Sequence, residues 1–179
     1  MRIISGTHGG RKISPPVKMP YTRPTTDIAR EGLFNIIQNN LDIGSLQTLD
    51  LFGGTGCISY EFASRGAQGL TIVEKDARMY EFINKTADGL AFENFKVVKM
   101  DVFRFMECCT DTFDLIFAGP PYALTTIDEI PKIVFNKNLL NPNGWFILEH
   151  TPANNYKAYP NFKTQRNYGT TVFSIFINN

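Results

Sequence analysis

The sequence contains no long apolar run, few cysteines and no cluster of metal-ligand side chains. No stretch approaches the roughly 18 apolar residues that a membrane-spanning helix needs, and the N-terminus lacks the basic and then apolar arrangement of a signal peptide. We therefore predict a cytoplasmic protein with no membrane partner. Low-complexity tracts and repeats of fixed period are also missing, so we expect little disorder beyond the ends of the chain.

Only three cysteines are present, Cys57, Cys108 and Cys109. An odd number with two adjacent members suits neither a disulfide framework nor the Cys-x-x-Cys spacing of a zinc site. The two histidines, His8 and His150, have no ligand partners at metal spacing. We therefore expect reduced, structural cysteines, ordinary polar histidines and no bound metal.

One domain is expected, because 179 residues are enough to bury roughly two-thirds of the unfolded surface around a single core. We assign residues 1–179 to one domain, with an extension over residues 1–24 and a core over residues 25–179. The composition, 43% hydrophobic and 20% charged, is typical of a globular protein. We expect a monomer, with the single tryptophan, Trp145, in its core.

The net charge of +1 hides an uneven distribution. Residues 1–30 carry +5 and the remainder of the chain carries −4. The charged residues of this segment are Arg2, Arg11, Lys12, Lys18, Arg23, Arg30 and Asp27. A basic segment of this kind favours contact with a polyanion, and the alternative is a solvated basic surface without a partner. Its glycines and prolines predict an irregular extension with one β-hairpin.

Short apolar runs alternate with helical stretches from Leu46 onward, which predicts βαβ units on a parallel sheet. Strands are expected near residues 46–51, 69–74, 95–99, 113–118 and 144–149, and helices near residues 56–65, 76–90 and 126–138. After Glu149, the segments 161–167 and 171–177 are joined at Tyr168-Gly169 and predict a closing antiparallel hairpin. The expected fold class is α/β, a Rossmann-like and mostly parallel doubly wound sheet with an antiparallel hairpin at its edge.

A helix is also expected before the first strand. The residues Thr25-Thr26-Asp27 can cap its N-terminus, and apolar residues at roughly helical spacing follow to about Asn39. These apolar residues are Ile28, Leu33, Phe34, Ile36 and Ile37. We expect most of them to lie in the core.

The first strand of the βαβ region runs into a glycine-rich turn, Asp50 to Gly56, and then into a helix. Such a turn lets the backbone approach a ligand closely and points amide groups into a crevice. A dinucleotide site needs Gly-x-Gly-x-x-Gly, but Ser59 stands where the third glycine would be. The turn therefore indicates a nucleotide-like cofactor and disfavours NAD.

Two acidic residues follow the next two strands. Glu74 ends the second strand, where a carboxylate can hold the two hydroxyls of a ribose. Asp101 follows the third strand and could accept a hydrogen bond from an adenine amino group, while Val102 and Phe103 wall the ring. Together with the glycine-rich turn, these residues favour S-adenosylmethionine; each acid taken alone could equally be a surface residue.

The fourth strand, Phe113 to Ala118, ends in Gly119-Pro120-Pro121-Tyr122. Amino-group methyltransferases present a target base at a turn of this type, usually with Asp or Asn before Pro-Pro-Tyr. An exocyclic amine attacks a methyl group poorly unless hydrogen-bond acceptors favour a pyramidal nitrogen and the attack is in line. Gly119 offers no side-chain oxygen for this purpose.

With these features in place, the chain closely resembles the RsmD family of bacterial 16S rRNA guanine-N2 methyltransferases over nearly its whole length. The most family-specific element is Arg23-Pro24-Thr25-Thr26-Asp27, followed by Arg30-Glu31 and Leu33-Phe34-Asn35. Further matches, in order and spacing, are Met1 to Gly6, Gly10-Arg11-Lys12, Asp50 to Gly56, Val73 to Asp76, Leu148-Glu149-His150 and Tyr168-Gly169.

The resemblance implies a class I methyltransferase that acts on the small ribosomal subunit or its assembly intermediate. The methyl group would pass from S-adenosylmethionine to the N2 amino group of a guanine, at position 966 of 16S rRNA by the family's pattern, leaving S-adenosylhomocysteine. The implied cofactor-binding residues are Thr25, Asp50, Phe52, Gly54, Gly56, Glu74, Lys75, Asp101 and Val102. The implied RNA-binding residues, which would contact phosphates in a salt-dependent way, are Arg2, Arg11, Lys12 and Arg23.

The implied catalytic residues are Gly119, Pro120, Pro121 and Tyr122. In the family pattern the acceptors are the first residue of the motif and the carbonyl of the first proline, and the tyrosine stacks on the flipped base. The missing side chain at Gly119 would cost roughly 100- to 1000-fold in rate. Three explanations compete: a natural loss of activity, an introduced substitution, or rescue by another acceptor such as Asp128 or a water.

Two other functions compete with guanine methylation. An adenine-N6 amino methyltransferase acting on DNA or RNA would share the cofactor turn and the Pro-Pro-Tyr motif. Arg23-Pro24-Thr25, and the lack of a separate DNA-recognition domain in 179 residues, favour an RNA substrate. A cofactor- and RNA-binding assembly factor without turnover is the second alternative, and Gly119 motivates it.

Overall fold

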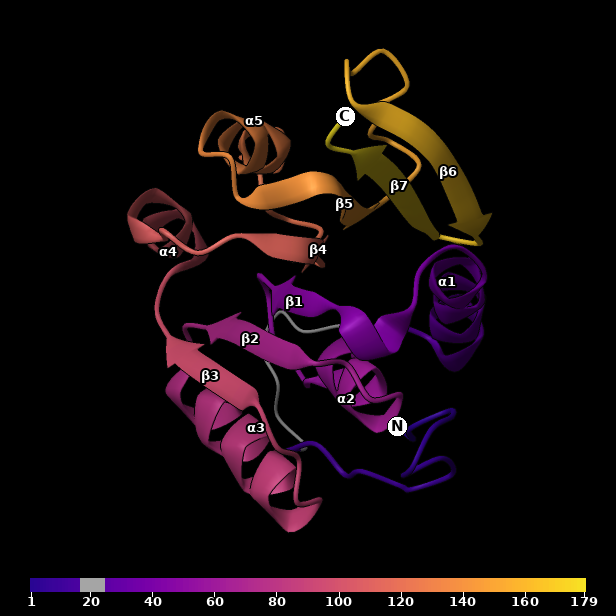
Figure 1. The fold of residues 1–179 in the computed structure, drawn as a ribbon, viewed down its shortest axis with the longest axis vertical. Helices are drawn as coiled ribbons and strands as arrows, with labels where there is room; N and C mark the ends of the chain where they lie inside the picture. Colours follow the sequence, from indigo (N-terminus) through magenta and orange to yellow (C-terminus); the bar gives the residue numbers. More distant parts are fainter. Residues whose placement is uncertain (17–24) are drawn as a thin grey trace.

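The computed structural model describes residues 1–16 and 25–179 and contains one seven-stranded sheet in the order β3-β2-β1-β4-β5-β7-β6. Strands β1 to β5 are parallel, and β7 lies antiparallel between β5 and β6 (Figure 1). The strands are β1 Gln47–Asp50, β2 Gly69–Glu74, β3 Phe95–Lys99, β4 Phe113–Ala118, β5 Leu140–His150, β6 Phe162–Tyr168 and β7 Thr171–Ile177. The predicted fold class, a doubly wound Rossmann-like sheet with an antiparallel hairpin at its edge, is confirmed.

The helices cover both faces of this sheet (Figure 1). They are α1 Asp27–Asn40, the 3-10 turn η1 Ile43–Ser45, α2 Cys57–Ser64, α3 Ala77–Gly89, α4 Val102–Cys108 and α5 Glu129–Asn136. One buried cluster joins α1, α2 and α3 to the sheet and includes Phe34, Tyr60 and Ile83. A second cluster joins α4 and α5 to the other face and includes Met106 and Ile130.

Helix α4, the seven-residue helix that follows β3, was not predicted from the sequence. Its N-terminus is capped by Asp101, whose Oδ1 accepts hydrogen bonds from the amides of Phe103 (3.0 Å) and Arg104 (3.3 Å). Within this helix, Met106 is fully buried. A helix this short shows too little periodicity to separate it from a loop, and its existence depends on packing against the sheet.

The expectation of a buried stripe along α1 holds for three of its five residues. Leu33, Phe34 and Ile37 are fully buried, whereas Ile36 is half-buried. Ile28 departs from the expectation, since it is 76% exposed. It is the second residue of α1, two positions after the N-cap Thr26, and its side chain faces solvent.

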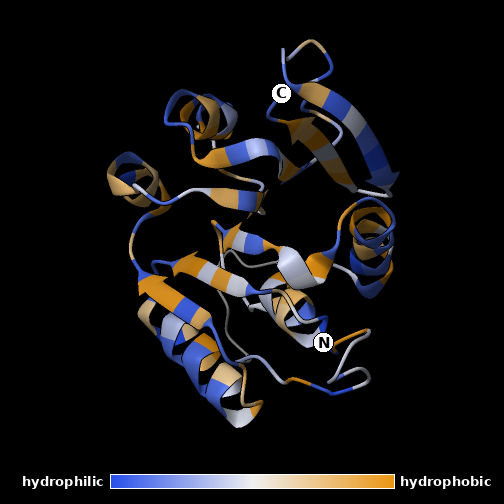
Figure 2. Cartoon of the chain, in the orientation of Figure 1, coloured by the Kyte–Doolittle hydropathy of each residue, from blue (hydrophilic) through white to orange (hydrophobic). Residues whose placement is uncertain are grey.

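The hairpin at the sheet's edge divides its two strands between core and solvent. Strand β7 is buried along nearly its whole length, while β6 is half-buried or exposed at every position. Figure 2 shows β6 as a largely hydrophilic strand at the end of the sheet. Charged and polar side chains on an edge strand discourage pairing with another chain. Trp145, on β5, is buried as predicted, and the three cysteines are free thiols.

Residues 1–16 form an irregular extension whose two sides pair as a short antiparallel hairpin. The amides of Ile3 and Ile13 donate to the carbonyls of Arg11 and Met1, both at 3.0 Å, around an antiparallel bridge between Arg2 and Lys12. The segment is tied to α2 by the carboxylate of Glu61, which accepts hydrogen bonds from the amides of Ile4 (2.8 Å) and Ser5 (3.1 Å). Since Glu61 is fully buried, these bonds attach the basic N-terminal segment firmly to the folded core.

Candidate functional site

The predicted catalytic residues and most of the predicted cofactor-binding residues lie at the carboxyl ends of the parallel strands. Asp50 and Glu74 are the last residues of β1 and β2, and Asp101 follows β3. The Pro-Pro-Tyr turn follows β4, and β5 ends at Glu149 and His150. Because β1 to β5 are parallel, their carboxyl ends lie on the same side of the sheet. This is the side on which open α/β sheets bind ligands.

The glycine-rich turn adopts a conformation that side chains would disturb. Gly54 and Gly56 have φ angles of +52° and +78°, in the region that favours glycine. A Cβ on Gly56 would lie 2.5 Å from Cζ of Tyr60, a residue of α2 whose ring is fully buried. The turn therefore keeps its backbone bare for close approach by a ligand.

Glu74 closes the turn through its carboxylate. Its Oε2 accepts a hydrogen bond of 2.8 Å from the amide of Gly54, and its Oε1 accepts one of 2.7 Å from the amide of Asp76. The Glu74 side chain remains half-buried, and a carboxylate has about four acceptor positions. Lys75 is exposed, and the contacts of Glu74 and Lys75 with the cofactor stay predictions.

Asp50 supports the turn from beneath. Its Oδ2 accepts a hydrogen bond of 2.7 Å from the Ser59 hydroxyl, and its Oδ1 accepts one of 3.3 Å from the amide of Phe52. The pKa of Asp50 is raised to about 6, chiefly because the carboxyl is buried; the hydrogen bonds from Ser59 and Phe52 lower this pKa, and the negative charges of Glu74 and Glu149 raise it. Ser59, in place of the third glycine, thus anchors α2 to the end of β1.

The residues expected around an adenine ring have different surroundings. Asp101 is exposed and already caps α4. Val102 is buried in the core, while Phe103 is half-buried and retains surface. Of the two apolar residues, Phe103 is therefore the one with more surface to offer a planar ligand, and the contacts of Asp101 and Val102 with the cofactor stay predictions.

Tyr122, in the Pro-Pro-Tyr turn, has an exposed aromatic ring and a hydroxyl group that is held by hydrogen bonds. Tyr122 is 40% exposed, yet its Oη donates a hydrogen bond to Oε1 of Glu149 (3.2 Å) and lies 3.1 Å from Oγ1 of Thr171. Pro120 is buried and Pro121 is exposed. The ring is held at its far end and keeps surface for stacking.

Glu149 is the residue that sequence reasoning missed. It is 4% exposed and accepts hydrogen bonds from two site residues, at Oε1 from Tyr122 and at Oε2 from the hydroxyl of Thr25 (2.7 Å). The signal was present in Leu148-Glu149-His150, but only the register of β4 and β5 brings this acid to Gly119. Thr25 consequently lies beside the Pro-Pro-Tyr turn, and its contact with the cofactor stays a prediction.

His150 does not take part in this network as an acid. Its Nε2 lies 2.8 Å from the hydroxyl of Ser174 and its Nδ1 lies 2.8 Å from the carbonyl of Thr151. Burial lowers the pKa of His150, so the ring is neutral at physiological pH. Within residues 1–16 and 25–179, no group of three or more His, Cys, Asp or Glu side chains is placed to hold a metal ion.

The predicted RNA-binding residues lie on the N-terminal segment, apart from Arg23, which falls outside the described residues. Arg11 and Lys12 are exposed. Arg2 is exposed as well, although its Nε donates to Oδ2 of Asp27 at 3.1 Å. Arg30, a basic residue of α1, is fully buried and donates to the carbonyls of Thr25 and Arg2, so its charge is not available to a partner.

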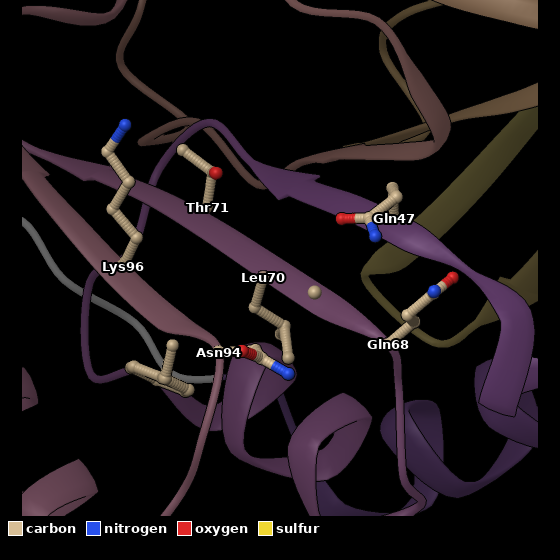
Figure 3. A pocket seen from close by; sticks show the side chains of 8 residues that line it. Gln47, Gln68, Leu70, Thr71, Asn94 and Lys96 are labelled. Atoms are coloured by element: carbon tan, nitrogen blue, oxygen red, sulfur yellow. The ribbon is translucent and has the colours of Figure 1, made fainter.

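A cavity of about 620 Å³ lies elsewhere on the molecule (Figure 3). It is lined by Gln47, Gln68, Gly69, Leu70, Thr71, Asn94, Phe95 and Lys96. Since Gln47, Gly69 and Phe95 are the first residues of their strands, the cavity lies at the amino ends of the parallel strands, opposite the carboxyl ends where the predicted site residues lie. Across the described part of the chain, no helix is long and apolar enough to cross a membrane.

Comparisons with known proteins extend these observations. The family model described as conserved hypothetical protein 95 matches residues 1–177. The ribosomal RNA small subunit methyltransferase D of Escherichia coli is 34% identical over 149 residues, which cover 83% of this chain and 71% of that protein. The solved structure of the yhhF protein of Escherichia coli is 27% identical, with a TM-score of 0.86 over 99% of this chain and 97% of that one.

A more distant structural neighbour was solved with ligands. It is a 16S rRNA N2 guanine methyltransferase from T. thermophilus in complex with AdoMet and guanosine, 21% identical, with a TM-score of 0.69. The shared region covers 87% of this chain and 44% of that one. At this level of identity the likeness concerns the fold.

Proposed function

Because the chain belongs to the family described as conserved hypothetical protein 95, the RsmD family, we propose that it methylates the exocyclic N2 amino group of a guanine in 16S rRNA. The chain is an S-adenosylmethionine-dependent rRNA methyltransferase. The finer proposal concerns the base, the atom and the position, guanine 966 by the family's pattern. Its substrate would be the small ribosomal subunit or an assembly intermediate, bound by a monomer in the cytoplasm.

The residues around the glycine-rich turn fit the cofactor. The turn has no Cβ at Gly54 or Gly56, and Tyr60 fills the space behind Gly56. The Glu74 carboxylate is fixed by the amide of Gly54 and could accept hydrogen bonds from both hydroxyls of a ribose. S-adenosylmethionine would supply an electrophilic methyl group at this edge.

The observation that carries the proposal is the cluster around the Pro-Pro-Tyr turn, at the same edge as Glu74. The exposed ring of Tyr122 can stack on a base that has left its helix, and its hydroxyl is held by Glu149 and Thr171. The carbonyl of Pro120 would accept a hydrogen bond from the target amino group. An amine held by acceptors and aligned with the methyl group needs no strong base.

A methyl-transfer assay with identification of the product tests this function. Small subunits that lack the modification, naked 16S rRNA and duplex DNA are each incubated with the protein and labelled S-adenosylmethionine, and the nucleic acid is digested to nucleosides. We expect N2-methylguanosine, with more product from subunits than from naked RNA. N6-methyladenosine would favour the adenine-directed alternative, and binding of cofactor and subunit without product would favour an assembly factor.

A further inference from the structure

Gly119 faces an acidic side chain across two strands. In the parallel pairing of β4 with β5, Ala118 lies opposite Leu148, so the next residues along the two strands are Gly119 and Glu149. A Cβ built on Gly119 would lie 3.6 Å from Oε2 of Glu149. The carboxylate therefore lies beside the place where the Asp or Asn side chain of the usual motif would begin.

The Glu149 carboxylate is held in one orientation from both sides. Thr25 donates to Oε2 at 2.7 Å and Tyr122 donates to Oε1 at 3.2 Å. Only 4% of the Glu149 surface is exposed. Groups fixed in this way before substrate arrives need no reorganisation during the reaction, which is the condition under which hydrogen-bond acceptors contribute most to catalysis.

The other acid that the sequence suggested as an acceptor, Asp128, supplies none of the three atoms nearest to a Cβ at position 119. Oδ1 of Asp128 accepts a hydrogen bond of 2.7 Å from the hydroxyl of Tyr156. The three atoms nearest to a Cβ at position 119 belong to Phe117, at 3.0 and 3.5 Å, and to Glu149. Glu149 is thus the acid that the fold brings to the vacant side-chain position.

We propose that the Glu149 carboxylate replaces the missing side chain of residue 119 and accepts a hydrogen bond from the amino group that is methylated. This role rests on the proposed function of the same site. The target nitrogen is then held between Glu149 and the carbonyl of Pro120, with its base on the ring of Tyr122. Glu149 is a catalytic residue, and Thr25 is a positioning residue that acts through it.

The chemistry at the target nitrogen balances without a further reactant. The nitrogen lone pair forms the new bond to the methyl carbon as the bond between that carbon and the sulfonium sulfur breaks. The electron pair of the broken bond stays on sulfur, which becomes the neutral thioether of S-adenosylhomocysteine. The nitrogen then loses one proton, which passes to the Glu149 carboxylate and from there to water.

The first test leaves Glu149 in place and compares Gly119→Asn with Gly119→Ala. Both variants add the same Cβ, which requires the Phe117 ring, 3.0 Å away, to shift by a few tenths of an ångström, but only Asn adds an acceptor. If Glu149 already supplies the acceptor, the single-turnover rates of the two variants on unmodified subunits agree within about 3-fold. A rate for Gly119→Asn about 100-fold or more above that of Gly119→Ala would overturn the proposal.

The second test removes the acceptor with Glu149→Leu, which is close in volume. We expect the single-turnover rate to fall by roughly 100- to 1000-fold, while S-adenosylhomocysteine binds with unchanged affinity. Adding Gly119→Asn to this variant should restore the rate at least about 10-fold relative to adding Gly119→Ala. An undiminished rate, or no restoration, contradicts the proposal. Should Glu149→Leu lose cofactor binding through misfolding, the first test decides alone.

The two readouts of this assay separate the inference from the proposed function. Total label transferred per protein molecule reports on Glu149, whichever amino group is methylated. The identity of the labelled nucleoside reports on guanine N2. Label on adenine with the expected variant pattern would leave the role of Glu149 intact and refute guanine methylation. Label from Gly119→Asn but none from the native chain would refute the role of Glu149.

Discussion

Glu74 and Gly54 are joined by a hydrogen bond of 2.8 Å from the Gly54 amide to Oε2 of Glu74. This bond connects the end of β2 with the turn after β1, two places that lie 20 residues apart in the sequence. It fixes the Glu74 carboxylate beside the backbone of the glycine-rich turn. A ligand that occupies the turn therefore meets an acceptor already in position.

Replacing Glu74 should weaken cofactor binding much more than it lowers the stability of the fold. For Glu74→Ala we expect S-adenosylhomocysteine affinity to fall about 10- to 100-fold, because hydrogen bonds to a charged group contribute about 1.5–3 kcal/mol. Isothermal titration calorimetry measures this affinity. Glu81→Ala, which changes the same charge at an exposed position on α3, is the matched control. Equal affinities for the two variants would show that Glu74 does not hold the cofactor.

A Cβ at Gly56 should damage the turn in two ways that a control can separate. Gly56→Ala strains a φ of +78° and places Cβ 2.5 Å from Cζ of Tyr60. Gly66→Ala strains a similar φ of +86° with no atom within 4 Å. We expect about 1–2 kcal/mol of lost stability for Gly66→Ala, from the φ strain alone, and a larger loss for Gly56→Ala.

Urea unfolding measures both stabilities, and binding of S-adenosylhomocysteine measures the state of the turn. Only Gly56→Ala should lose this binding. A Gly56→Ala variant as stable as Gly66→Ala, with native cofactor affinity, would show that the Tyr60 ring yields to the new methyl group without consequence.

The raised pKa of Asp50 predicts a pH-dependent loss of stability. Burial lifts this pKa from 3.8 to about 6 in the folded protein, so between these values the folded state binds more protons than the unfolded state. The contribution of Asp50 to stability therefore falls as pH rises from about 4 to about 6 and stays constant above. The total change is about 3 kcal/mol.

Asp50→Asn removes this titration and keeps an oxygen that can accept from the Phe52 amide. The difference in unfolding free energy between variant and native protein, measured in urea, should move in favour of the variant by about 2 kcal/mol between pH 4 and pH 7.5. A difference independent of pH would place the pKa of Asp50 near its ordinary value.

The N-terminal basic residues should matter for RNA and not for the cofactor. Arg11→Ala together with Lys12→Ala should weaken binding to the small subunit. The slope of log affinity against log salt concentration should become shallower by about two. Affinity for S-adenosylhomocysteine should not change. Filter binding at several salt concentrations gives the slope.

Lys163→Ala with Arg166→Ala is the control, because both residues are exposed on the edge strand β6 and the net charge changes equally. If this control weakened binding as much as the N-terminal pair, general charge would explain the effect. Equal binding by the N-terminal pair and the native protein across the titration would remove the segment from the RNA-binding surface.

The order of the elements, the glycine-rich turn and the Pro-Pro-Tyr motif could be read from local patterns. Alternation of apolar runs and helical stretches reflects the period of each element, and Gly54 and Gly56 mark a backbone that side chains would obstruct. These signals act within a few residues of chain. The same holds for the caps of α1 and α3, since Thr26 and Asp76 bond to amides two or three residues away.

Tertiary structure alone decided which side chains meet. Glu149 was recognisable as part of a matching motif, but its position beside Gly119 depends on the register of β4 and β5. Its hydrogen-bond partner Tyr122 lies 27 residues away in the sequence. The burial of Arg30, the exposure of Ile28 and the formation of α4 also depend on packing between distant segments. Sequence determined the kinds of chemistry available at the sheet's edge, and the pairing of parallel strands decided which acid stands opposite the glycine.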